Sequence, residues 1–150
     1  MRFHLVDRID KLEPDRRVLA RKLTSHREDY WRDYGRGSEM PQHLILEALC
    51  QAGTWLVISS TDRRLRAALL SIDAVAFFGS VRPGDVVMLD GQVDSINSEI
   101  AVLSGTASVA GETVMQADSI MCALINADQL DSPEATKSMQ EHLLQIGDSK

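Results

Sequence analysis

One apolar segment, residues 41–59, constrains the fold of this chain more than any other feature. A helix with apolar side chains almost all round is buried on most of its sides. Pro41 suits the first turn of such a helix, because the N–H that proline lacks would have no intrahelical partner there. The sequence therefore predicts a long helix enclosed by other elements. Its apolar residues are Leu44, Ile45, Leu46, Ala48, Leu49, Ala52, Trp55, Leu56, Val57 and Ile58.

A polar stripe interrupts this helix. His43, Glu47 and Gln51 are spaced by four residues and share one face. Burying an unpaired carboxylate costs several kcal/mol or raises its pKa. Glu47 is therefore a candidate site residue. The stripe alone leaves a second interpretation open, in which Glu47 emerges at a dimer surface or is capped by a loop amide.

After the helix the hydrophobic pattern changes to a period of two, which is typical of strands. Arg82-Pro83-Gly84-Asp85 has the residues of a type II turn, and Gly111 marks another tight connection. One helix and one sheet leave an open sheet edge, which we expect to pair with another subunit. The expected strands lie near residues 17–24, 67–78, 85–97, 99–110 and 113–125, and residues 25–40 are expected to form a long loop.

The end of the chain predicts a separate helical tail. Ser132 and Pro133 suit an N-cap and a first turn. Met139, Leu143 and Ile146 would form one apolar stripe of a helix near residues 133–146. We therefore expect one main domain over residues 1–130 and a tail over residues 131–150.

Composition excludes several classes of protein. The net charge of −6 argues against nucleic-acid binding, and no apolar run is long enough to span a membrane. Cys50 and Cys122 lack the spacing of metal ligands and are expected to be free thiols of a cytoplasmic protein. No glycine-rich phosphate loop is present, so we expect no cofactor.

Charge is distributed unevenly along the chain. Residues 1–66 carry 13 Lys/Arg and 10 Asp/Glu, whereas residues 67–150 carry 3 and 12. The basic residues either form a patch for an acidic partner or a phosphate, or are scattered, solvated side chains. They are Arg16, Arg17, Arg21, Lys22, Arg27, Arg32, Arg36, Arg63, Arg64 and Arg66.

Several motifs resemble those of the FabZ-type 3-hydroxyacyl-(acyl-carrier-protein) dehydratases over about residues 3–125. Met40-Pro41 and the segment 44–52 resemble the family's M-P-G-x-L-x-x-E-A-x-x-Q-A helix start, and residues 81–85 resemble its V-x-P-G-D turn. Residues 5–9 and 12–14 resemble its opening strand and the turn that follows, and residues 117–123 resemble its last strand. The resemblance implies an α+β hotdog fold, in which an antiparallel sheet wraps a long central helix. It also implies a homodimer or a trimer of dimers, with active sites at the dimer interface.

The loop before the helix departs from the family's G-H-F-x-G-x-P motif. Asp33 stands where the family has its basic histidine, Arg36 and Ser38 replace a glycine and a proline, and Gln42 replaces the helix-start glycine. The resemblance assigns the catalytic roles to Asp33 and Glu47. Substrate contacts are expected from Tyr34, Gln42, His43 and Gln51. An exposed carboxylate is a weaker base than an imidazole, although two carboxylates that share a site raise one pKa.

Three functions follow from this pattern, and all concern acyl thioesters of acyl carrier protein or coenzyme A. The first is a divergent dehydratase of fatty acid or polyketide-type metabolism that acts on 3-hydroxyacyl thioesters. The second is a thioesterase, in which Asp33 or Glu47 attacks the carbonyl or activates water. The third is a non-catalytic acyl-binding protein or a partner subunit of an active dehydratase.

Overall fold

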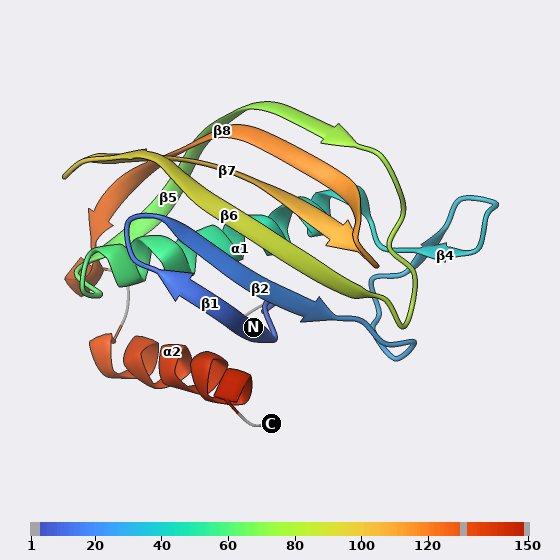
Figure 1. Cartoon of the computed structure of the whole chain (residues 1–150), viewed down its shortest axis with the longest axis horizontal. Helices are drawn as coiled ribbons and strands as arrows, with labels where there is room; N and C mark the ends of the chain where they lie inside the picture. The colour runs from blue at the N-terminus through green and yellow to red at the C-terminus, as the bar shows by residue number, and fades with distance from the viewer. Residues whose placement is uncertain (1–3, 130–131, 149–150) are drawn as a thin grey trace.

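The computed structural model describes residues 4–129 and 132–148. One antiparallel sheet curves around a long helix, in the strand order β1-β2-β6-β7-β8-β5 (Figure 1). This arrangement confirms the predicted α+β hotdog fold. The helix is α1 (Gln42–Ser60), and the strands are β1 (Arg8–Glu13), β2 (Arg17–Leu23), β5 (Leu65–Phe77), β6 (Val86–Ile96), β7 (Ile100–Val109) and β8 (Glu112–Asn126).

The strands agree with the period-two pattern to within about two residues at each end. The predicted turn between β5 and β6 is present, since the Asp85 N–H donates to the Arg82 carbonyl at 3.0 Å and Gly84 has φ +95°. The opening strand that the resemblance implied is β1. The expected loop over residues 25–40 contains a small two-stranded hairpin, β3 (Arg32–Asp33) and β4 (Ser38–Glu39), which extends beyond the start of α1 (Figure 1).

The core lies between α1 and the concave face of the sheet. Ile45, Leu49 and Leu56 of α1 are 0–2% exposed, as the apolar pattern predicts. Gly105 of β7 allows the helix to approach closely. A Cβ atom there would clash with the Asp90 carbonyl oxygen and lie 2.9 Å from Leu49 Cδ1. A side chain at position 105 would therefore disturb the pairing of β7 with β6 and the packing of Leu49 against the sheet.

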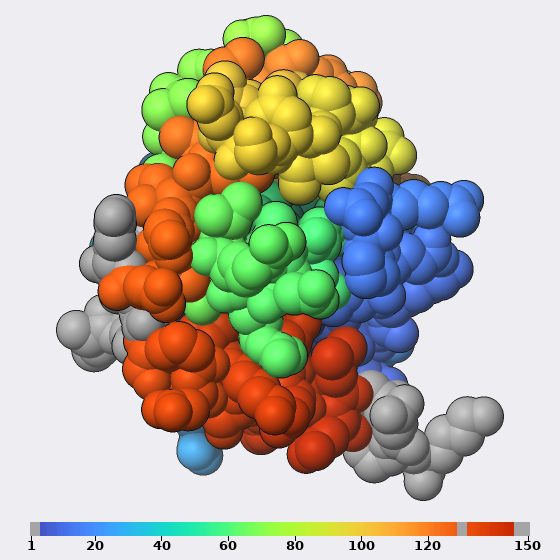
Figure 2. Space-filling view, turned by 90° about the vertical axis from the view of Figure 1, so that its left-hand side faces the viewer, coloured from blue at the N-terminus to red at the C-terminus, as the bar shows by residue number. Residues whose placement is uncertain are grey.

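The predicted tail helix is α2 (Pro133–Asp148), which follows the short 3-10 helix η1 (Ala127–Gln129). The Ser132 Oγ accepts from the Ala135 N–H at 3.4 Å, as expected of an N-cap. Leu143 is buried and Met139 is half-buried, whereas the Ile146 side chain lies outside the described residues. Figures 1 and 2 show α2 beneath β1 and the end of α1. The expected boundary at residues 130 and 131 also lies outside the described residues.

Strand β5 forms one edge of the sheet and pairs with β8 among the described strands. Leu69 and Leu70 on this edge are each 57% exposed. An exposed apolar edge invites pairing with another strand, so the predicted dimer through an open edge stays a prediction with a defined location. Neither described helix is long and apolar enough to cross a bilayer.

Candidate active site

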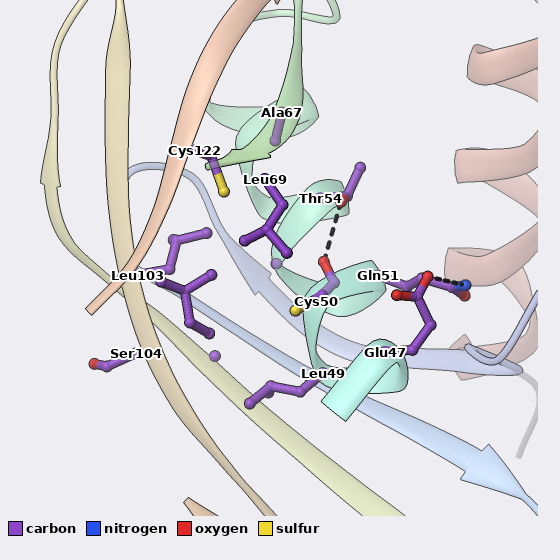
Figure 3. A pocket seen from close by; sticks show the side chains of 13 residues that line it. Glu47, Leu49, Cys50, Gln51, Thr54, Ala67, Leu69, Leu103, Ser104 and Cys122 are labelled. Carbon is purple, nitrogen blue, oxygen red and sulfur yellow. Dashed lines mark hydrogen bonds between the residues drawn. The ribbon is translucent and has the colours of Figure 1, made fainter. Parts of the chain in front are cut away.

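Glu47 and Gln51 of the predicted polar stripe form a hydrogen-bonded pair on α1. The Gln51 Nε2 donates to Glu47 Oε1 at 3.0 Å. The Gln51 Oε1 in turn accepts from the Leu5 N–H at 2.8 Å. These two bonds orient the Gln51 amide, so the segment before β1 helps to hold an exposed carboxylate in place. Figure 3 shows the bond between Gln51 and Glu47.

An apolar cavity of about 190 Å³ lies beside this pair, between α1 and the sheet (Figure 3). Both Glu47 and Gln51 contribute to its wall. An apolar cavity with a few placed polar groups is the usual form of a small-molecule site. The other lining residues come from α1, β5, β6, β7 and β8: Leu49, Cys50, Gly53, Thr54, Ala67, Leu69, Gly91, Leu103, Ser104, Ile120 and Cys122.

The Cys50 thiol lines the same cavity one helical turn after Glu47. Burial raises its pKa to about 11, with further contributions from the negative charge of Glu47 and from Cys122. Burial also raises the pKa of the Cys122 thiol. Both cysteines are free, and Cys50 is protonated at neutral pH, so it is not an activated nucleophile.

A second cavity, of about 580 Å³, lies at the start of α1. Tyr34, Gln42 and His43 all line it, so the structure brings together three of the predicted substrate contacts. The first turn of α1 has no side-chain cap and no acidic residue. Its backbone N–H groups and the positive end of the helix dipole therefore favour a negatively charged or polarised oxygen.

A charged cluster connects the β3–β4 hairpin to the loop between β5 and β6. Glu39 is 7% exposed and lies between Arg36 and Arg82, with N–O distances of 3.5 and 3.4 Å. The Arg82 Nη1 also donates to the Arg36 carbonyl at 2.9 Å. The cluster holds the hairpin beside the second cavity, which Arg36 and Glu39 line together with Tyr34.

Asp33 is exposed and is the last residue of β3, directly before the turn of this hairpin. Its Oδ1 accepts from the N–H groups of Gly35 and Gly37 at 2.7 and 3.2 Å. Asp33 lines neither of the two cavities. Within one chain the structure thus joins Glu47 to Gln51, and it gives Asp33 a local role in the hairpin. The meeting of Asp33 with Glu47 across a dimer stays a prediction.

Comparison with known proteins identifies the family. Residues 1–118 match the model of the FabA-like domain. The 3-hydroxyacyl-(acyl-carrier-protein) dehydratase FabZ of Chloroflexus aggregans is 36% identical over 77% of this chain and 82% of its own. The FabZ of Thermomicrobium roseum is 33% identical over 91% and 88%. This chain belongs to the FabA-like family.

Solved structures agree with the fold of this FabA-like protein. A Streptococcus mutans protein determined with bound acetyl CoA has a TM-score of 0.65 at 16% identity, over 84% of this chain and 92% of its own. One chain of the dehydratase heterocomplex ApeI:P from Xenorhabdus doucetiae has a TM-score of 0.63 at 15% identity, over 90% and 88%. The family and the fold together make this chain an acyl-thioester-handling hotdog protein.

The sequence reasoning missed two functional candidates in this FabA-like protein, Glu39 and Arg82. A signal for Glu39 was present, because a charged residue directly before Met40-Pro41 enters the buried start of α1. No sequence signal pairs it with Arg82, which lies 43 residues away. The cluster holds the hairpin next to the start of α1.

Proposed function

We propose that this chain interconverts 3-hydroxyacyl and 2-enoyl thioesters, with Glu47 as one of two catalytic carboxylates. The observation that supports this function is the Glu47–Gln51 pair beside an apolar cavity, in a chain of the FabA-like family. The second carboxylate is Asp33 of the partner subunit in a homodimer or a trimer of dimers. Tyr34, Gln42, His43 and Gln51 contact the substrate.

The reaction needs one of the two carboxyl groups to carry a proton and the other to be ionised, because one acts as acid while the other acts as base. In dehydration, Asp33 removes a proton from C2 and Glu47 gives a proton to the C3 hydroxyl. The C3–O bond breaks, water leaves, and a C2–C3 double bond forms. The backbone N–H groups at the start of α1 stabilise the negative charge that develops on the thioester oxygen. Hydration reverses each step.

The thioester enters by the second cavity, and its carrier, acyl carrier protein or coenzyme A, lies at the rim of that cavity. Arg36 at its rim has a side chain that is 71% exposed and suits a phosphate or an acidic helix. Five of the other basic residues are less suited to bind the carrier, because they already pair with carboxylates or lie far from this cavity. Arg17, Arg21 and Lys22 pair with Asp90, Asp10 and Glu28, respectively. Arg63 and Arg64 follow the opposite end of α1 and share a hollow with Asp62 and Asp128.

Purified protein tests the function directly. We expect it to convert 3-hydroxyacyl thioesters to 2-enoyl thioesters and to catalyse the reverse reaction, and Glu47→Gln to lower the rate by at least about a hundredfold. Glu99→Gln is a matched control, because Glu99 is exposed at the turn before β7. Release of free thiol without enoyl formation would instead indicate a thioesterase, and full activity of Glu47→Gln would contradict the role of Glu47.

A second candidate function is that of a non-catalytic partner subunit in a dehydratase heterocomplex. The hydrogen bonds of Asp33 within its own hairpin favour it, because they engage Oδ1 of the carboxylate that must serve as base. The similar Xenorhabdus chain comes from such a heterocomplex. We expect this function only if the pure protein shows no turnover and gains activity when mixed with a histidine-bearing FabZ subunit. The free thiols of Cys50 and Cys122 fit a reducing cytoplasm in either case.

A further inference from the structure

A third cavity, of about 220 Å³, lies between α1 and α2. Trp55 and Ile58 form its wall on α1, and Ala135, Thr136 and Met139 form its wall on α2. The helix α2 lies outside residues 1–118, which match the FabA-like domain. One wall of this cavity is therefore formed by a helix outside the residues that match the FabA-like domain.

Two residues line both this cavity and the apolar cavity beside Glu47. They are Gln51 and Thr54, which face the same flank of α1. The Gln51 side chain extends from Glu47 toward the side on which α2 lies, while Leu49 and Cys50 point to the sheet (Figure 3). The side chains of Gln51 and Thr54 thus form the wall between the cavity beside Glu47 and the cavity beneath α2.

The lining residues of α1 follow one another along a single flank. Glu47, Gln51, Trp55 and Ile58 are separated by four, four and three residues, which is the spacing of one helix face. From position 47 to position 58 the helix rises by roughly 16 Å at about 1.5 Å per residue. A path along this flank, which we call the acyl groove, would begin at the candidate catalytic carboxylate, cross the wall formed by Gln51 and Thr54, and end in the cavity beneath α2.

Because the two cavities share the wall formed by Gln51 and Thr54, we propose that the acyl chain of the thioester runs along α1 and that its distal end lies beneath α2. The proposal rests on the proposed function, and it makes α2 the element that selects acyl chains of medium length. Short chains end before Gln51 and Thr54, whereas longer chains pass them and bury their last methylene groups against Trp55, Ile58 and Met139. The carrier lies at the opposite end of α1, beside the second cavity.

His4, Gln51, Thr54, Arg66 and Thr136 are the polar residues that border this cavity, and three of them direct polar atoms to partners in the protein. The Arg66 Nη1 donates to the carbonyls of Arg63 and Leu65 at 3.1 and 3.0 Å, so this part of the guanidinium is directed to the turn after α1. The Thr54 Oγ1 donates to the Cys50 carbonyl at 3.0 Å within α1. Gln51 is directed to Glu47 and Leu5. These bonds leave the stems of Arg66 and Thr54 for contact with hydrocarbon.

Filling the cavity from α2 tests the proposal. Met139→Trp places a large ring at a lining position, and Ser138→Trp places it at an exposed neighbouring position that does not line the cavity. For 3-hydroxydecanoyl thioester, we expect Met139→Trp to lower kcat/KM by about tenfold, as when roughly two methylene groups can no longer be buried. For 3-hydroxybutyryl thioester, and for Ser138→Trp with either substrate, we expect less than about a twofold change.

Enlarging the cavity is the opposite change, and a binding measurement makes the test independent of turnover. We expect Met139→Ala to raise the preference for decanoyl over butyryl thioesters. We also expect decanoyl-CoA, and not butyryl-CoA, to change the fluorescence of Trp55, and Trp55→Phe to abolish that change. If no substrate turns over but the Trp55 signal follows chain length, the proposed function fails and the acyl groove stands. If turnover and fluorescence are both independent of chain length and of Met139, the groove is refuted.

Discussion

The α1 flank that carries Glu47 and the β3–β4 hairpin that carries Asp33 hold their side chains in different ways. Glu47 stands on a 19-residue helix whose inner face is buried, and Gln51 on the same helix fixes its carboxylate. Asp33 stands on strands of two residues each, and its carboxylate helps to close the turn. The helix is held by apolar side chains that pack against the sheet, whereas the hairpin is held by charged side chains at its base. Substitutions in the core should therefore affect the position of Glu47, whereas substitutions of charged residues should affect the position of Asp33.

The largest effect should come from the charge of Asp33. In Asp33→Asn the amide oxygen can still accept from Gly35 and Gly37, so the hairpin is kept while the charge is removed. If Asp33 is the second catalytic carboxylate, we expect turnover of 3-hydroxyacyl thioesters to fall by about a hundredfold or more. Steady-state kinetics measure this, with the exposed neighbour Asp29→Asn as control. Unchanged turnover would show that Asp33 serves only the hairpin.

A substitution on the helix side should act on stability rather than on the hairpin. In Gly105→Ala the new methyl group clashes with the Asp90 carbonyl oxygen of β6 and meets Leu49 Cδ1, so β7 must shift against β6 and Leu49 of α1 must repack. We expect the free energy of unfolding to fall by about 1–3 kcal/mol, measured by urea denaturation. Gly79→Ala is the matched control, because its methyl group meets only Val114 Cγ1, at 3.2 Å, in an exposed loop. Equal stability of the two variants would show that the sheet and Leu49 accommodate a methyl group at position 105 without cost.

The hairpin should depend instead on the ion-pair cluster at its base. Arg82→Met removes one partner of the buried Glu39 and the bond to the Arg36 carbonyl. Because Arg82 is 46% exposed, we expect a loss of only about 1 kcal/mol in unfolding free energy. Hydrogen exchange should speed up in residues 32–39 and not in α1. In the double variant Glu39→Gln/Arg82→Met, we expect less than the summed effect of the two single variants. Additive effects would show that the two residues do not interact.

The same contrast explains how far the sequence predicted the structure. The long apolar pattern placed the central helix at 41–59, against Gln42–Ser60 in the structure, because a buried helix carries a strong signal. The Glu47–Gln51 pair followed from spacing within one helix. The hairpin carried no such signal, since its strands are two residues long and Arg36 contacts Arg82 at a distance of 46 residues in sequence. The resemblance assigned Asp33 a role, but only the structure showed that its carboxylate bonds within the turn.

The smallest expected effect concerns Cys50, because the pKa of its thiol depends in part on the negative charge of Glu47. The pKa of Cys50 is about 11 against an ordinary 9.0, so at pH 8 it carries roughly a hundredfold less thiolate than an ordinary thiol. In a Cys122→Ala background, which leaves Cys50 as the one cysteine, its alkylation by iodoacetamide should be slow at pH 8 and rise toward pH 11. Glu47→Gln removes a negative charge that raises this pKa, so the pKa falls and alkylation at pH 8 becomes severalfold faster. Glu99→Gln should leave the rate unchanged. Equal rates in all three proteins would mean that the Glu47 carboxylate does not act on the thiol, and that burial alone protonates Cys50.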